Sequence, residues 1–229
     1  KQGDILIVEA DEYDRSFLQL HADIAIITSV DADHLDIYED KSALQAAFIQ
    51  FASQVKLKGV LIVEDSIGID FPTPKGGVSL TYSAKNKADY YADNIKIKEG
   101  KMVFDMTALG ISLGISCQKK QEDLELQLPG IHNISNSVAA SAVSFYLGLS
   151  FEDVANGLAT FKGIKRRFEK HIDTDTLVYI DDYAHHPKEV VATIDTTKQL
   201  YPTRDLTVIF QPHLFSRTQD FAKEFATSL

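Results

Sequence analysis

Short apolar runs alternate with a longer amphipathic segment along the first third of the chain. Residues 5–8 (ILIV), 24–28 (IAIIT) and 59–65 (GVLIVED) are short and rich in β-branched side chains, a pattern typical of strands buried on both faces. Between the last two runs, residues 41–55 place their apolar side chains at helical spacing. Strands and a helix in this order predict a βαβ unit and a parallel sheet.

The pattern changes between residues 82 and 128. Polar and apolar side chains alternate there, and glycines interrupt the alternation, which predicts antiparallel hairpins and a small meander attached to the parallel sheet. Residues 128–148 then begin with Leu-Pro-Gly and continue as a helix rich in small side chains. Ser150 and Asp153 predict a capped start for the next helix, which extends to about residue 161.

The alternation of strands and helices begins again after the basic, glycine-containing stretch GIKRRF. The elements expected beyond it are strand 177–180, helix 187–200 with proline in its first turn, strand 206–210 and helix 216–229. We therefore expect an α/β protein of two parts. Residues 1–164 form a parallel-sheet domain with a small antiparallel meander, and residues 165–229 form part of a second α/β domain.

Composition and charge exclude several classes of protein. The 229 residues carry a formal net charge of −10, which argues against a nucleic-acid-binding face. The single cysteine allows no internal disulfide bond and fits a reducing compartment. No apolar run approaches the ~18 residues of a membrane span. We expect a cytoplasmic protein that binds neither nucleic acid nor membrane, and the sequence carries no signal of its oligomeric state.

Acidic side chains follow two of the predicted strands. Glu9 ends the first apolar run, and SVDADHLD (residues 29–36), which contains His34, follows the second. The carboxyl ends of parallel strands form the edge where open α/β sheets bind ligands. Mg²⁺ prefers carboxylate oxygens and usually meets the protein through one or two side chains plus substrate phosphates. Two alternatives stay open: an acidic, solvated turn, or a magnesium and phosphate site.

Two further clusters have both a structural and a functional interpretation. LPGIHNISNS places His132, Asn133 and Asn136 at the start of a helix. Asparagine is common at helix starts, but its amide also matches the hydrogen-bonding edge of adenine. KRRF, which includes Arg167, is either a solvated linker or a phosphate-binding group, because arginine binds phosphate oxygens bidentately.

Polar side chains also follow both predicted strands of the second part. YIDDYAHHPKE contains Asp182, Tyr183 and His185, and FQPHLFSRT contains His213 and Arg217. Histidines with a pKa near neutrality suit proton handling or contact with a substrate amine. An arginine suits a substrate carboxylate. These side chains are expected at the binding edge of the second sheet.

Six motifs together resemble the Mur ligases: VEADEYDRSF, DADHLDIY, LPGIHNISN, GIKRRF, DDYAHHPKEV and FQPHLFSRT, in this order. The resemblance covers essentially all 229 residues. It implies a UDP-sugar domain, a central P-loop-type ATPase domain to which residues 1–164 belong, and a Rossmann-like domain to which residues 165–229 belong. The motifs are most similar to those of members that join L-alanine to UDP-N-acetylmuramate in peptidoglycan synthesis, using ATP and Mg²⁺. FQPHLFSRT separates them from the sister muropeptide ligases.

The resemblance also implies roles for individual residues. It assigns Glu9 and His34 to Mg²⁺, His132, Asn133 and Asn136 to adenine, Arg167 to the ATP phosphates, Asp182 to the ribose, and Tyr183, His185, His213 and Arg217 to the L-alanine pocket. Glu9, His34 and Arg167 are thereby the expected catalytic residues. Many relatives have an arginine where this chain has Leu214, so recognition of the alanine carboxylate is expected to depend more on Arg217.

Two other functions compete with the ligase. One is a metal-dependent hydrolase built on Asp33, His34, His185 and His186, which predicts tight transition-metal binding without nucleotide. The other is a nucleotide-binding module without catalytic activity. In calorimetry with Zn²⁺ and with Mg-ATP, strong zinc uptake together with no response to nucleotide would favour the hydrolase.

No G-x-x-x-x-G-K-[ST] loop occurs in the sequence, although the resemblance implies one upstream of residue 1 to hold the phosphates. We therefore predict that the isolated 229-residue chain does not turn over ATP. A phosphate-release assay should give the same rate for this chain and for its Glu9→Ala variant. Steady release above the rate of that variant would contradict the prediction.

Overall fold

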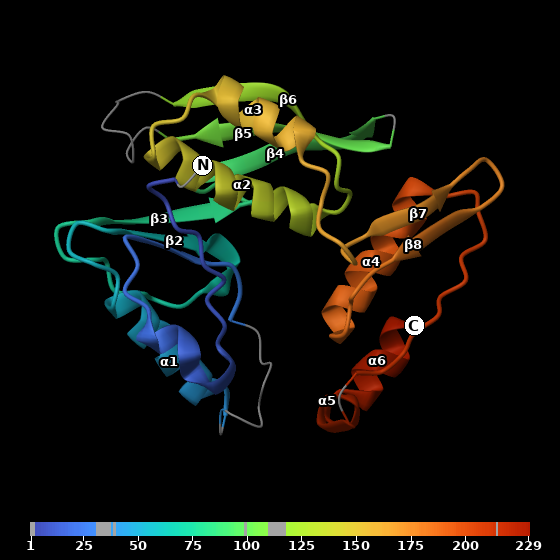
Figure 1. Ribbon diagram of the computed structural model, residues 1–229, viewed down its shortest axis with the longest axis horizontal. Helices are drawn as coiled ribbons and strands as arrows, with labels where there is room; N and C mark the ends of the chain where they lie inside the picture. The colour runs from blue at the N-terminus through green and yellow to red at the C-terminus, as the bar shows by residue number, and fades with distance from the viewer. Residues whose placement is uncertain (1–2, 31–37, 39, 99, 110–117, 214) are drawn as a thin grey trace. The chain divides into compact units, whose positions relative to one another are not determined.

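The computed structural model describes residues 3–30, 38, 40–98, 100–109, 118–213 and 215–229 (Figure 1). Its elements are η1 (Tyr13–Gln19), β1 (Ile24–Ile27), α1 (Lys41–Ser53), β2 (Val60–Glu64), η2 (Asp65–Ile67), β3 (Val78–Ser83), β4 (Tyr90–Lys98), β5 (Lys101–Ala108), β6 (Lys119–Leu126), α2 (Ile131–Tyr146), α3 (Phe151–Thr160), β7 (Glu169–Asp173), β8 (Val178–Asp181), α4 (Pro187–Leu200), α5 (Phe215–Asp220) and α6 (Ala222–Ser228). Contacts divide the chain into two compact units. The first holds residues 1–91, 107–120 and 138–148, and the second holds residues 92–106, 121–137 and 149–229.

A six-stranded sheet contains the first six strands in sequence order. The pairs β1–β2, β2–β3 and β3–β4 are parallel, as the βαβ pattern predicts. The first four residues of β2 are buried, so this strand is covered on both faces as expected. Burial on both faces is wrong for β1, where Ile26 is 38% exposed. An apolar run therefore identified both strands but did not distinguish one-sided from two-sided burial.

The helix α1 packs against β1 and β2 and forms a hydrophobic core with them (Figure 1). Asp40 begins the helix, since its side chain accepts a hydrogen bond from the Ala43 backbone nitrogen at 2.8 Å. Phe17 of the 3₁₀ helix η1 joins the same core, with its ring 5.2 Å from that of Phe48 and 5.1 Å from that of Phe51. The apolar face of α1 thus connects the sheet to the segment that follows Glu9.

The meander expected between residues 82 and 128 is formed by β4, β5 and β6, which are neighbours in the sheet. Only residues 99 and 100 separate β4 from β5, and a connection this short joins antiparallel strands. Lys101 of β5 pairs with Glu125 of β6, their charged atoms lying 2.9 Å apart. The α/β class with a parallel sheet and a small antiparallel part is confirmed.

The predicted helices α2, α3 and α4 are present. Ser150 and Asp153 form the expected capping box of α3, and Pro187 is the first residue of α4. The second unit also contains a short antiparallel sheet, β7–β8, and a small core in which Val190 and Ile194 of α4 meet Phe225 of α6. Within the described ranges, no helix is both long and apolar enough to cross a membrane.

Two predicted strands are wrong. Residues 5–8 and 206–210 have no strand geometry, and Ile7 and Ile209 are 90% and 93% exposed. A strand requires a hydrogen-bonding neighbour as well as a suitable sequence. Neither segment has a paired strand among the residues that the structure describes. The apolar pattern alone therefore overestimated the regular structure of these two segments.

Two other differences concern the second unit. The single helix expected at residues 216–229 is two helices, α5 and α6, because Phe221 between them leaves helical geometry (φ −113°, ψ 23°). The strand β7 was not expected, since its sequence EKHID has too many charged side chains to resemble a buried strand. Residues 169–173 form a strand because their backbone pairs with β8, not because their side chains favour a buried strand.

The core under α1 leads to a stability prediction. Leu44 is 1% exposed, whereas Ile49 on the same helix is 38% exposed. We expect Leu44→Ala to lower the free energy of unfolding by about 2–5 kcal/mol, because it removes buried contacts and leaves a cavity. The matched variant Ile49→Ala should lower it by less than about 1 kcal/mol. Urea unfolding followed by circular dichroism measures both, and equal losses would contradict this account of the core.

Candidate functional site

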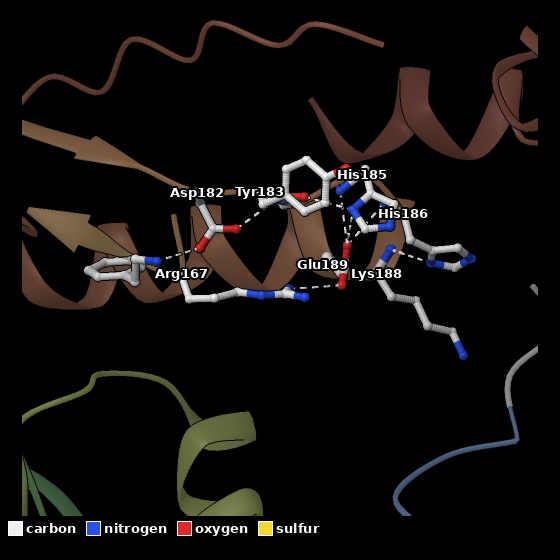
Figure 2. Close-up of polar contacts among 9 residues, drawn as sticks. Arg167, Asp182, Tyr183, His185, His186, Lys188 and Glu189 are labelled. Carbon is white, nitrogen blue, oxygen red and sulfur yellow. Dashed lines mark hydrogen bonds and ion pairs between the residues drawn. The ribbon is translucent and has the colours of Figure 1, made fainter. Parts of the chain in front are cut away.

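The carboxylate of Asp182 connects two segments of the second unit (Figure 2). One oxygen accepts a hydrogen bond from the Phe168 backbone nitrogen at 2.8 Å, and the other accepts one from the Ala184 backbone nitrogen at 2.8 Å. The Tyr183 nitrogen also donates to the Arg166 carbonyl at 2.7 Å. The turn that contains Arg167 is thereby held against the end of β8. Each Asp182 oxygen keeps a second lone pair, so contact with a ribose hydroxyl is still chemically possible.

The turn itself has an unusual backbone. Arg166 and Phe168, on either side of Arg167, have positive φ angles of 57° and 51°. This left-handed conformation is unfavourable for residues with a Cβ atom. The bonds from Asp182 and Tyr183 hold the turn in this shape, and the side chain of Arg167 then reaches α4.

Glu189 connects Arg167 to the start of α4 (Figure 2). Its Oε1 lies 3.2 Å from an Arg167 guanidinium nitrogen, while its Oε2 accepts backbone hydrogen bonds from His185 at 2.9 Å and His186 at 3.2 Å. Desolvation raises the pKa of Glu189, but the His185 backbone bond and the Arg167 guanidinium outweigh it, so the pKa lies below its usual value. Glu189 therefore remains ionised, caps the helix and holds the arginine.

Three aromatic side chains from the predicted alanine pocket lie together. The Tyr183 ring is 4.8 Å from that of His185 and 6.1 Å from that of His213, and the two histidine rings are 6.3 Å apart. His185 Nδ1 lies 2.7 Å from the Tyr183 carbonyl oxygen. Because a carbonyl oxygen can only accept, Nδ1 is the donor in this contact.

These three residues border a cavity of about 1040 Å³. Its walls are β8, α4 and residues 203–213. This volume lies just above the ~300–1,000 Å³ of small-molecule sites, so selectivity must come from side chains rather than from size. Arg217 does not border the cavity; it is buried in α5 with 7% of its surface exposed.

His132 lies in the first turn of α2. Desolvation lowers the pKa of its imidazole, and the charge of Arg167 lowers it further, whereas Asp182 and Glu189 act in the opposite direction. The ring is therefore neutral at pH 7 and can donate one hydrogen bond and accept another. His132 and the Arg167–Asp182–Glu189 group are thus electrostatically connected within the second unit.

The two asparagines of α2 differ. The side-chain Nδ2 of Asn133 donates a hydrogen bond to the Pro129 carbonyl oxygen at 2.7 Å. The backbone carbonyl oxygen of Asn133 accepts one from the Ser137 hydroxyl at 2.8 Å. Asn136 is exposed. An adenine contact by Asn133 would therefore use its amide oxygen or break the bond to Pro129. Asn136 has the more accessible side chain for this role.

The predicted magnesium site is only partly described. Glu9 has an exposed side chain, while His34 and the neighbouring Asp33 lie outside the described residues. Leu214 lies outside them as well. The proximity of Glu9 and His34 therefore stays a prediction.

His185 and His186 do not converge on one point, as a hydrolase metal site would require. His186 Nδ1 accepts a hydrogen bond from the Lys188 nitrogen at 3.3 Å, and its ring lies 5.1 Å from that of Phe221. His185 instead contacts Tyr183. The geometry of the described histidines thus gives no support to the hydrolase alternative.

The sequence analysis did not single out Glu189, and it named Arg166 only as part of the basic KRRF stretch. Glu189 had a readable signal, since His186 and Glu189 stand three apart around Pro187, the spacing of a capping box. The contact of Arg166 had no such signal: its guanidinium carbon lies 4.7 Å from the centre of the Tyr183 ring, and that ring belongs to a segment beyond the β7–β8 hairpin. Side chains that act through other side chains are therefore the harder ones to predict.

Comparison with known proteins covers the same residues. A family model described as the Mur ligase middle domain matches residues 1–144, and one described as the Mur ligase, glutamate ligase domain, matches residues 166–229. A UDP-N-acetylmuramate–L-alanine ligase of Christiangramia forsetii is 44% identical over 229 residues, which is 100% of this chain and 47% of that protein. One of Flavobacterium johnsoniae is 45% identical over 225 residues, 98% of this chain and 46% of that protein.

A solved structure supports the same relationship. The crystal structure of the UDP-N-acetylmuramate-alanine ligase of Thermotoga maritima matches with a TM-score of 0.71 at 26% identity, covering 94% of this chain and 45% of that one. This chain thus spans about half the length of the relatives that it matches. Since the middle-domain model matches residues 1–144 of 229, more than half of the sequence, this chain belongs to the Mur ligase family.

Proposed function

We propose that this chain is the central and C-terminal part of an ATP-dependent ligase that joins L-alanine to UDP-N-acetylmuramate in peptidoglycan synthesis in the cytoplasm. The observation that carries the proposal is the similarity along all 229 residues to relatives with this activity in their name, at 44% identity. The grouping of Arg167, Asp182, Tyr183, His185 and His213 in the second unit supports it. The domain boundary near residue 164 is part of the proposal.

The reaction needs two steps. The γ-phosphoryl group of ATP passes to the lactyl carboxylate of the muramic acid, which yields ADP and an acyl phosphate. The amine of L-alanine then attacks the acyl carbon, and the C–O bond to phosphate breaks as the amide C–N bond forms. The amine loses a proton in this step, and inorganic phosphate leaves with the bonding electron pair. Positioning of the reactants supplies much of the acceleration.

The His185 imidazole is suited to the amine step. Its Nδ1–H donates to the Tyr183 carbonyl at 2.7 Å, which leaves Nε2 as a base. A neutral imidazole can take a proton from the alanine ammonium group and so release the nucleophilic amine. Tyr183 and His213, whose ring centres are 6.1 Å apart, border the same cavity and would contact the substrate there.

The Arg167 guanidinium is suited to the phosphoryl step. Glu189 engages one of its nitrogens at 3.2 Å, and the remaining N–H groups are available for phosphate oxygens. Glu9 and His34 would hold Mg²⁺, and the exposed carboxylate of Glu9 fits an ion that keeps several water molecules. A bound Mg²⁺ neutralises charge on the phosphate oxygens.

The proposal predicts the amino acid that the full-length protein accepts. With UDP-N-acetylmuramate and ATP, L-alanine should give the amide product with a higher kcat/KM than glycine. One methyl group in an apolar site is worth ~1–3 kcal/mol, or about 10–200-fold. Mass spectrometry of the product and coupled ADP release measure this selectivity. Absence of a product with any amino acid would contradict the proposed function.

The lowered pKa of Glu189 predicts a pH dependence of stability. As the pH falls below the usual value of 4.5, the unfolded chain binds a proton before the folded chain does. The stabilisation by ionised Glu189 is therefore complete above pH 4.5 and is lost below it. Urea unfolding at several pH values should show wild type and Glu189→Gln converging as the pH falls. A Glu224→Gln control, in the exposed first turn of α6, should show no such convergence.

A further inference from the structure

Three potential metal ligands lie on one face of the β7–β8 hairpin. Glu169 and Asp181 are directly opposite each other in the antiparallel pairing. The register shifts between Lys170 and Ile172, so His171 is the extra residue of a β-bulge. The imidazole of His171 lies within 3.9 Å of the Glu169 carboxylate and 3.8 Å of the Asp181 carboxylate, so the three side chains are on the same side of the hairpin. Bulges reorient side chains in this way next to functional sites.

The distances within this group fit a single ion. His171 Nε2 lies 3.9 Å from Glu169 Oε2 and 3.8 Å from Asp181 Oδ2, and one ligand atom from each residue lies within 4.8 Å of the others. Tetrahedral Zn²⁺ with bonds of 2.0–2.2 Å separates its ligand atoms by roughly 3.4 Å. The side chains are 43%, 32% and 33% exposed for His171, Glu169 and Asp181. The two histidine–carboxylate distances exceed this separation by about 0.5 Å, so side-chain rotations are needed to bring the three ligand atoms to bonding distance.

We propose that Glu169, His171 and Asp181 bind a divalent transition-metal ion of the Zn²⁺ type. The imidazole decides the class of metal, because nitrogen ligands suit zinc and its neighbours, whereas Mg²⁺ prefers oxygen. Three protein ligands leave a fourth position for water. This site uses none of the residues assigned to ATP, magnesium or L-alanine, and it does not depend on the proposed ligase activity.

Arg166 competes with the ion for the same carboxylate. Its Nε lies 3.6 Å from Asp181 Oδ2, and its backbone nitrogen donates to Glu169 Oε2 at 2.8 Å. A bound cation would repel the guanidinium from Asp181 and shift it from the face of the Tyr183 ring, 4.7 Å away. Metal binding at the hairpin would thus weaken the contact of Arg166 with Tyr183, which borders the large cavity.

Calorimetric titration of the 229-residue chain with Zn²⁺ alone tests the proposal. We expect the unchanged chain to bind one more zinc ion than His171→Ala, or to bind it at least about tenfold more tightly, since even indirect partners of a metal contribute about 10–100-fold. His21→Ala, which removes an exposed histidine of the first unit, is the matched control and should bind as the unchanged chain does. A large excess of Mg²⁺ should not displace the ion.

Arg166→Ala provides an independent test, because it removes the competing charge. It should bind zinc about two- to fivefold more tightly, the range expected for loss of an exposed ion pair. Circular dichroism confirms that each variant is folded, and His171→Asn replaces His171→Ala if the latter unfolds. Equal zinc binding by the His171 and His21 variants, or no zinc binding by the unchanged chain, would overturn the site. An unchanged affinity in Arg166→Ala would overturn the competition.

Discussion

The two backbone hydrogen bonds accepted by Asp182 are the constraint on which the site depends. They join the turn around Arg167 to the end of β8, with one bond to Phe168 and one to Ala184. They act together with the β7–β8 pairing and with the backbone bond from Tyr183 to Arg166, which join the same two segments. With them, Arg167 is directed toward α4, and Tyr183 toward the cavity. A charged side chain that accepts backbone bonds on both oxygens is thus the central structural element of the second unit.

Glu189 adds the charge balance that this arrangement requires. It satisfies two free N–H groups at the start of α4 and faces the positive end of the helix dipole, while its other oxygen engages Arg167. In a chain of net charge −10, the Glu189 carboxylate therefore holds Arg167 in place through one guanidinium nitrogen and does not engage the other N–H groups of that arginine. The same helix start orients His185. Glu189 therefore positions both Arg167, proposed for the phosphoryl step, and His185, proposed for the amine step.

Local signals in the sequence predicted the elements that depend on local chemistry. The bounds of α4 follow from Pro187 and its apolar spacing, and those of α3 from Ser150 and Asp153. Residues 5–8 and 206–210 failed because strand formation depends on a partner elsewhere in the chain. In the site, Tyr183, His185 and His213, which the sequence led us to expect at one edge, lie close together, while their role stays a prediction. The backbone role of Asp182 and the contact of Arg166 could not be predicted, since both arise only after folding.

The left-handed turn around Arg167 has a consequence for attempts to make this protein more robust. At Arg166 and Phe168, glycine would relieve a conformational cost of roughly 1–2 kcal/mol for each residue. Yet glycine at residue 166 would remove the guanidinium that faces both Asp181 and the Tyr183 ring. Thermal stability therefore favours glycine at residue 166, whereas the contacts with Asp181 and Tyr183 require arginine. Selection for thermostability alone would tend to erase the very side chain that connects the hairpin to the cavity.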